Sequence, residues 1–289
     1  MIIDGKQLSQ TIKDEVKAKL SRLENKLTLL VIMVGDNPAS KVYVENKEKA
    51  CKKVGMNSKT LLFDSNVSQK KIIDEIRKAN EDPTINGILV QLPLPAHLDE
   101  VAIIDSIDPK KDVDGLTTFN QGRLFTNNPN CIVPATPKGI MHIIDSLFYN
   151  LSGKNAVVIG RSKLVGKPMA QLLLARNATV TMCHSKTENL GEVCANADVL
   201  VVAIGKAKFI TADMIKPGAL VIDVGINRNY GRLDGDVDFE NAANVAGYIT
   251  PVPGGVGPPS LTLILRLSMV LGTRTLTGPL NMPPGSPPL

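Results

Sequence analysis

The stretch AVVIGRSKLVG, residues 156–166, decides the fold of this chain. Its first five residues form a short apolar run that is typical of a buried strand and ends at a glycine. A helical pattern follows from Leu164 to Arg176, so the stretch spans the turn between a strand and a helix. The alternation continues with strands over residues 178–183, 197–205 and 219–224 and near 248, and with a short helix over 187–195. This layout predicts a dinucleotide-binding domain of Rossmann type.

The turn from Gly160 to Gly166 is a weak form of the glycine-rich phosphate loop. The usual loop has three glycines, for a tight turn, for close approach of a pyrophosphate and for helix packing. Here Ser162 stands in the place of the second glycine. The position between a strand and a helix strengthens the interpretation, because a helix N-terminus attracts phosphate.

The end of the next strand indicates which nucleotide binds. An NAD site usually carries Asp or Glu there to bind the ribose hydroxyl, whereas this chain reads CHSK over residues 183–186. Arg161 and Ser185 can give a 2′-phosphate a charge-assisted contact and a hydroxyl donor. The sequence therefore predicts NADP. Arg161 could also be an ordinary surface charge, and the missing acid would still disfavour NAD.

The first half of the chain alternates in the same way. Strands are expected at 28–35, 59–63 and 85–92, and helices at 38–54, 68–80 and 98–107. Such alternation predicts a second, mostly parallel sheet covered on both faces. Ligands of open parallel sheets bind beyond the carboxyl ends of the strands.

The helix over 38–54 places a lysine on its inward face. Asn37 can cap its start, Pro38 suits its first turn and Gly55 can end it. Lys47 lies in the middle of the apolar stripe. Its ammonium could reach water along apolar surface, or it could lie in a cleft where burial lowers its pKa and makes it a proton donor or acceptor. Tyr43, one turn earlier, is either a stacking surface or an ordinary half-buried tyrosine.

Three loops are further candidates for a site. Gln91 opens the run QLPLP (91–95), in which prolines stiffen the backbone and can include a cis bond; a surface glutamine is the alternative. The run KDVDG (111–115) carries two acids that face opposite ways in an extended segment, so one of them can face inward. The run PVPGGVGP (251–258) predicts a rigid wall that a ligand can approach closely, or a structural crossover.

Composition excludes several classes of protein. The chain has 289 residues, 43% of them hydrophobic and 21% charged, with a net charge of +5 and scattered basic residues, so a nucleic-acid interface is not expected. Four cysteines and three histidines show no metal-type spacing, which predicts reduced thiols, no structural metal and a cytoplasmic location. No apolar run approaches the length of a membrane span, and the N-terminus lacks the pattern of a secretory signal.

Taken together, several motifs resemble the methylenetetrahydrofolate dehydrogenase/cyclohydrolase family. They are YVENKEKAC, ILVQLPLP, KDVDG, GRSKLVGKP, CHSKT, VIDVGIN and ITPVPGGVGP, in order between Ile2 and Pro258. The resemblance implies two α/β domains with a cleft between them, NADP on the C-terminal domain, a tetrahydrofolate derivative against the N-terminal domain, and a homodimer. It also implies oxidation of methylenetetrahydrofolate to methenyltetrahydrofolate, followed by hydrolysis to 10-formyltetrahydrofolate.

The resemblance also implies roles for residues at matching positions. Lys47 is the catalytic lysine, Gln91 tunes it, Tyr43 packs against the folate ring and Asp114 holds the pterin. The other folate-site residues are Val90, Leu92, Pro253, Gly254, Gly255, Val256 and Gly257, and the NADP contacts are Gly160, Arg161, Ser162, Ser185 and Ile226.

The implied domains are residues 1–133, joined by a helix over 260–272, and a Rossmann domain over 151–258, with a linker helix over 134–150. After Pro258 the sequence departs from the family pattern and ends in a Pro-rich tail, 273–289, that we expect to be extended or disordered. A shifted reading frame and an unusual lineage both explain such an end. Two other interpretations stay open: a shikimate-type two-domain NADP-dependent dehydrogenase and a non-catalytic NADP-binding module.

Overall fold

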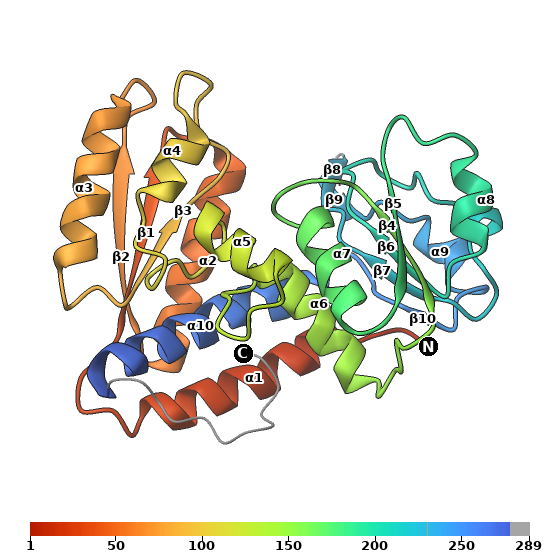
Figure 1. Cartoon of the computed structure of the whole chain (residues 1–289), viewed down its shortest axis with the longest axis horizontal. Coiled ribbons are helices and arrows are strands. Elements are labelled where there is room, and N and C mark those ends of the chain that lie inside the picture. The colour runs from red at the N-terminus through yellow and green to blue at the C-terminus, as the bar shows by residue number, and fades with distance from the viewer. Residues whose placement is uncertain (230, 278–289) are drawn as a thin grey trace. The chain divides into compact units, whose positions relative to one another are not determined.

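The computed structural model describes the backbone of residues 1–229 and 231–277. The chain forms two compact units (Figure 1). The N-terminal unit comprises residues 11–135 and the described residues from 261, and the C-terminal unit comprises residues 1–10 and 136–260. Three helices contain residues of both units: α1 (Gly5–Leu20), α6 (Ala135–Ser146) and α10 (Gly257–Thr277).

The N-terminal unit is built on a parallel three-stranded sheet in the order β2-β1-β3. Its strands are β1 (Thr28–Val34), β2 (Asn57–Phe63) and β3 (Gly87–Val90), and its helices are α2 (Pro38–Val54), α3 (Gln69–Glu81), α4 (Glu100–Asp105) and α5 (Thr118–Phe125). One apolar core lies between the sheet and helices α3 and α4, and includes Ile32, Ile72, Ile88 and Ile103, none of which is measurably exposed. Helix α2 lies on the other side of the sheet (Figure 1).

The C-terminal unit is built on a parallel five-stranded sheet in the order β10-β7-β6-β4-β5. The strands are β4 (Asn155–Ile159), β5 (Thr179–Cys183), β6 (Val199–Val202), β7 (Leu220–Asp223) and β10 (Tyr248–Ile249), and a separate antiparallel pair is formed by β8 (Asn227–Asn229) and β9 (Arg232–Asp234). The remaining elements are α7 (Gly166–Ala175), α8 (Leu190–Ala195), the 3₁₀ turn η1 (Ala212–Met214) and α9 (Phe239–Ala242).

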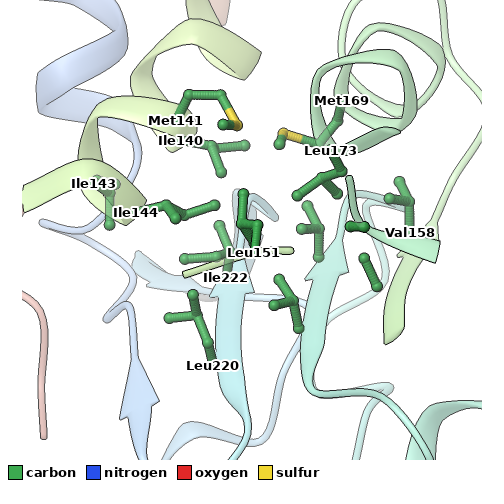
Figure 2. Close-up of a cluster of buried hydrophobic side chains, with 14 of the residues drawn as sticks. Ile140, Met141, Ile143, Ile144, Leu151, Val158, Met169, Leu173, Leu220 and Ile222 are labelled. Carbon is green, nitrogen blue, oxygen red and sulfur yellow. The ribbon is translucent and has the colours of Figure 1, made fainter. Parts of the chain in front are cut away.

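Two apolar cores cover the faces of this sheet. Figure 2 shows the first, in which Ile140 and Ile144 of α6 and Met169 and Leu173 of α7 pack over the strands. The second lies under α8, η1 and α9 and includes Cys183 and Cys194. The inner strands β4, β6 and β7 are buried on both sides and read as apolar runs, whereas the edge strand β5 alternates exposed threonines with apolar residues. The predicted doubly covered α/β fold is confirmed in both units.

Several elements differ from the sequence prediction, among them the 3₁₀ turn η1 and the short helix α9, which were not predicted. Helix α1 and helix α5 were not predicted, nor was the β8–β9 pair, whose short polar strands carry no apolar alternation. The predicted C-terminal helix exists but begins at Gly257 and reaches Thr277, so residues 273–277 of the predicted extended tail are helical. The rest of that tail, 278–289, lies outside the described residues.

Candidate functional site

Helix α2 carries Lys47 into the interior of the N-terminal unit. The helix begins as predicted, since the Asn37 side chain accepts hydrogen bonds from two backbone N–H groups of the first turn, and it ends at Gly55 in the left-handed conformation. Lys47 lies on the buried face and is only 8% exposed. Of the two interpretations left open by the sequence, the structure therefore supports a desolvated amine over one that reaches water.

Gln91 fixes the amine. The Lys47 Nζ donates to Gln91 Oε1 at 2.7 Å, and Gln91 Nε2 donates to the Leu92 carbonyl at 2.7 Å. The second bond orients the amide so that its oxygen faces Lys47. Val90 ends strand β3 and is buried, while Gln91 N still bonds to Ile32 O at 2.8 Å. The sheet thus positions Gln91, and the Leu92–Pro93 peptide bond that follows is cis.

The two acids of KDVDG have different surroundings. Asp112 is 1% exposed and accepts hydrogen bonds from Thr117 N at 2.9 Å, Thr117 Oγ1 at 2.8 Å and Asn120 Nδ2 at 2.9 Å. It therefore holds the turn that starts helix α5. Lys111 is also structural, because its Nζ donates to the carbonyls of Ala79 and Asp82 at 2.9 and 2.7 Å.

Asp114, the second acid, interacts electrostatically with Lys47. Burial is the main cause of an increase in the pKa of Asp114; Lys47 opposes this increase and Asp112 adds to it. Burial likewise lowers the pKa of Lys47, and Asp114 counteracts the decrease. The site therefore holds a base and an acid whose charges are both disfavoured by burial and mutually supported. Perturbed pairs of this kind are typical of catalytic sites.

Tyr43 differs from its predicted place on the buried stripe, because it is 43% exposed. Helix α2 starts beyond the carboxyl end of β1, so the strands do not cover the first turns of the helix. Its ring offers an exposed aromatic surface one turn before Lys47.

The phosphate loop of the C-terminal unit depends on its glycines. Gly160 has φ +117°, and a Cβ there would lie 2.3 Å from the Ala203 carbonyl oxygen. A Cβ on Gly166 would lie 2.1 Å from Gly160 O, so this glycine permits close packing of α7 on β4. Ser162 does not act as a substitute glycine. Its Oγ accepts from Val165 N at 3.1 Å and from Gly166 N at 3.4 Å, which closes the turn that leads into α7.

Arg161 and Ser185 leave the sheet side by side. Ile159 of β4 pairs with Cys183 of β5, and each of the two polar residues follows its strand by two positions. Both side chains are exposed. Both residues therefore follow neighbouring strand ends at one edge of the sheet, and their contact with a 2′-phosphate stays a prediction.

The glycine-rich run is a structural crossover for part of its length. A Cβ on Gly255 would lie 2.6 Å from Thr250 Cβ, and Val256 is 5% exposed within the unit's apolar core. Pro253 follows a cis peptide bond and is exposed, as is Gly257, while Gly254 has φ +112°. Within the predicted folate-site residues 253–257, Pro253, Gly254 and Gly257 retain surface that a ligand can contact. Ile226, after β7, is 49% exposed.

Comparison with known proteins assigns both units. Residues 3–114 match the tetrahydrofolate dehydrogenase/cyclohydrolase catalytic domain, and residues 134–274 match the NAD(P)-binding domain of the same family. The chain belongs to the tetrahydrofolate dehydrogenase/cyclohydrolase family. Lys47, Gln91 and Asp114 lie within the family's catalytic domain, and the phosphate loop lies within its nucleotide domain. Because the family match continues to residue 274, the prediction that the family pattern ends at Pro258 was wrong.

Relatives of this family cover nearly the whole chain. The bifunctional protein FolD of Streptococcus pneumoniae (strain D39) is 52% identical over 280 residues, which are 95% of this chain and 98% of that protein. The crystal structure of bifunctional FolD from Campylobacter jejuni is 42% identical with a TM-score of 0.93 and covers 95% of this chain and 99% of that one. The Trypanosoma brucei enzyme, crystallised with NADP cofactor and an inhibitor, is 34% identical with a TM-score of 0.92 over 96% of this chain and 98% of that one.

Family membership decides against the shikimate-type dehydrogenase and the non-catalytic module. Among the described residues there is no group of three or more His, Cys, Asp or Glu side chains that could hold a metal ion. The described part of the chain also contains no helix that is long and apolar enough to span a membrane.

Proposed function

We propose that Lys47 takes the proton from the attacking water in the cyclohydrolase reaction, with Gln91 and Asp114 setting its position and charge. The chain is a methylenetetrahydrofolate dehydrogenase and a methenyltetrahydrofolate cyclohydrolase, and its cofactor is NADP. The observation that supports the role of Lys47 most directly is the 2.7 Å bond from its buried Nζ to Gln91 Oε1.

The dehydrogenase step needs no protein nucleophile. NADP accepts a hydride from the bridging carbon of methylenetetrahydrofolate, which becomes the methenyl cation. The two reacting atoms must come within about 3–3.5 Å, so bound folate and bound NADP have to meet during turnover. The cleft predicted from the sequence stays a prediction, as do the predicted domain boundaries.

The cyclohydrolase step needs a group that accepts a proton from the attacking water. Water attacks the methenyl carbon and loses a proton to the base. The hydroxyl group so formed loses its own proton as the bond from this carbon to N5 breaks, N5 takes up a proton, and the carbon remains on N10 as a formyl group, so that one proton is released overall. A neutral amine can accept the proton of the water, and burial favours the neutral form of Lys47. One N–H of this amine donates to Gln91. The lone pair of the Lys47 nitrogen is then available to accept a proton from the attacking water. The cation of the substrate further disfavours an ammonium at this place.

The other candidate residues bind the folate or the cofactor. Asp114 accepts hydrogen bonds from the pterin, and Tyr43 stacks against the folate ring, for which its exposed ring is suited. Val90, Leu92 and the exposed residues of the glycine-rich run border the folate. On the C-terminal unit, Gly160 allows the pyrophosphate to approach, and Arg161 and Ser185 bind the 2′-phosphate. The absence of an acid among residues 184–186 supports the preference for NADP over NAD.

The resemblance also supports a homodimer, which light scattering during size-exclusion chromatography tests. A cytoplasmic location agrees with four free, buried cysteines.

The variant Lys47→Met tests the central assignment. Methenyltetrahydrofolate hydrolysis is followed by decay of the methenyl absorbance, and the dehydrogenase by NADPH formation from methylenetetrahydrofolate. The expected result is loss of hydrolysis with part of the dehydrogenase activity retained. Wild-type hydrolysis in a folded Lys47→Met protein would remove the lysine from the mechanism.

A further inference from the structure

Two buried aspartates of the C-terminal unit tie together three segments that follow strands β6, β7 and β9. Asp223 is 2% exposed and Asp236 is fully buried. We call them, with the backbone groups that they bind, the carboxylate clasp. Asp223 belongs to the motif VIDVGIN, whereas Asp236 belongs to no motif discussed above.

Asp236 binds the loop after β6. Its Oδ2 accepts from Ile204 N at 2.7 Å and from Gly205 N at 2.9 Å, and its Oδ1 accepts from Lys206 N at 2.8 Å. Gly205 has φ +65°. Three successive N–H groups that converge in this way form an anion-binding nest. In this chain the nest holds a carboxylate of the protein itself.

Asp223 completes the clasp. Its Oδ1 accepts from Gly225 N and Asp236 N, and its Oδ2 accepts from Val237 N, each at 2.9 Å. The surrounding space is full, because a Cβ on Gly225 would lie 2.3 Å from the Asp236 carboxylate and one on Gly235 would lie 1.9 Å from Asp223 Oδ2. The packing therefore leaves no room for a second arrangement of the two carboxylates.

The clasp also fixes the backbone on both sides of Ile226. Gly225 N donates to Asp223, and the Asn227 side chain donates to Asp236 Oδ1 at 2.9 Å. Strands β6 and β7 are neighbours, so both tied loops leave the same carboxyl edge of the sheet. A dinucleotide lies beyond this edge in Rossmann domains.

We propose that Asp236 is a positioning residue for the cofactor: it holds the loop 204–206 and the backbone around Ile226 in the conformation that binds NADP. The inference rests on the proposed binding of NADP to the strand ends of this unit. Asp236 acts through the protein backbone and needs no contact with the nucleotide.

The variant Asp236→Asn keeps the size of the side chain but turns one acceptor oxygen into an N–H₂ group. That group faces backbone donors, so at least one of the three loop N–H groups loses its partner. The apparent Kd for NADP equals the intrinsic Kd divided by the fraction of molecules in which the loop keeps its NADP-binding conformation. If the loop keeps its position about one tenth of the time, the Kd for NADP rises about tenfold.

Asp198→Asn is the matched control. Asp198 also accepts from a backbone N–H, of Asn155 at 2.9 Å, and from Lys216 Nζ at 2.6 Å. It precedes β6 and so lies at the opposite, amino edge of the same sheet. This variant removes a partly exposed carboxylate that also binds a backbone N–H, without touching the loops of the clasp, and its Kd for NADP should equal that of the wild type.

The experiment measures NADP binding by titration calorimetry for the wild type, Asp236→Asn and Asp198→Asn. The rate of methenyltetrahydrofolate hydrolysis without NADP measures how much of each preparation is folded and active. We expect a Kd about tenfold higher for Asp236→Asn alone, at an unchanged number of binding sites per active molecule. If Asp236→Asn does not fold, Asn227→Ala, which removes one bond to Asp236, should raise the Kd at least about twofold.

The outcomes separate the two proposals. A wild-type protein that hydrolyses methenyltetrahydrofolate but does not bind NADP would overturn the proposed cofactor site. A wild type that binds NADP, with Asp236→Asn or its substitute Asn227→Ala binding equally well, would overturn the positioning role. An equal loss of affinity in Asp198→Asn would also overturn it, because the effect would then be general instability of the unit.

Discussion

The bond between Lys47 and Gln91 allows the role of the lysine to be tested by changing one atom group. Gln91→Glu keeps the shape of the side chain and places a carboxylate where the amide oxygen now lies, 2.7 Å from Lys47 Nζ, while the Leu92 carbonyl loses its bond from Nε2. Burial lowers the pKa of Lys47 in the native protein. A new negative charge at contact distance favours the ammonium and raises this pKa.

The size of the effect follows from the distance. Two unit charges about 4 Å apart interact by about 4 kcal/mol at an effective dielectric constant of about 20, and an opposite charge within hydrogen-bonding distance shifts a pKa by about 1–3 units. Each unit lowers the fraction of neutral amine about tenfold at a pH below the pKa. Hydrolysis at neutral pH should therefore fall about 10- to 1,000-fold.

The pH profile distinguishes this cause from simple damage to the site. Because the Lys47 pKa rises in Gln91→Glu, the neutral amine appears only at higher pH. The rise of activity with pH should move toward alkaline values by about 1–3 units. The assay is decay of the methenyl absorbance over a series of pH values, with the enzyme-free rate subtracted at each one.

Gln69→Glu is the charge-matched control in the same unit. Gln69 accepts from Asp99 N at 2.9 Å through an oxygen that a carboxylate retains. Its hydrolysis rate and pH profile should match the wild type. If Gln91→Glu hydrolyses at the wild-type rate with an unshifted profile, the neutral amine of Lys47 is not the base.

Two further predictions concern single residues outside this pair. Gly160→Ala should reduce the NADP-dependent dehydrogenase activity about tenfold or more and leave NADP-free hydrolysis unchanged. The reason is that a Cβ 2.3 Å from Ala203 O, at a φ of +117°, forces the loop to move. Equal loss of both activities would contradict this prediction. Lys111→Met should lower the free energy of unfolding by about 2 kcal/mol in a urea titration, since two carbonyls lose their bonds to Nζ; an unchanged midpoint would show that these bonds contribute no net stability.

Local signals explain which parts of the fold could be predicted from the sequence. Helix α2 was predicted with its observed bounds because Asn37, Pro38 and Gly55 each mark a helix end by their own chemistry. The apolar runs of β1 and β4 were also found, within one residue of their ends. Helix α5 was missed because its sequence, TFNQGRLF, is polar, although Thr117 caps it at Asn120 N. Helix α1 had an apolar spacing of four residues at Ile12, Val16 and Leu20 that should have revealed it.

The candidate site was predicted less evenly. Lys47 could be found because a lysine on an apolar stripe is anomalous, and its partner Gln91 because a proline-rich turn follows a strand. The burial of Gly255 and Val256 could not be found, since a glycine-rich run has the same appearance whether a ligand or the protein's own backbone approaches it. The carboxylate clasp could not be predicted from the sequence for a different reason. Asp236 binds backbone groups 30–32 residues away, and backbone donors leave no mark in the sequence.

The aspartates discussed above differ in what compensates their charge. Asp112 and Asp236 each accept at least three hydrogen bonds from their own unit. Asp223 accepts three backbone N–H bonds as well, yet burial raises its pKa to about 6. Burial also raises the pKa of Asp114, and there the opposing charge is the titratable amine of Lys47. A carboxylate whose compensation comes from a titratable amine is sensitive to any ligand that approaches the pair. In the site proposed above, protonation of Lys47 and substrate binding at Asp114 are therefore coupled.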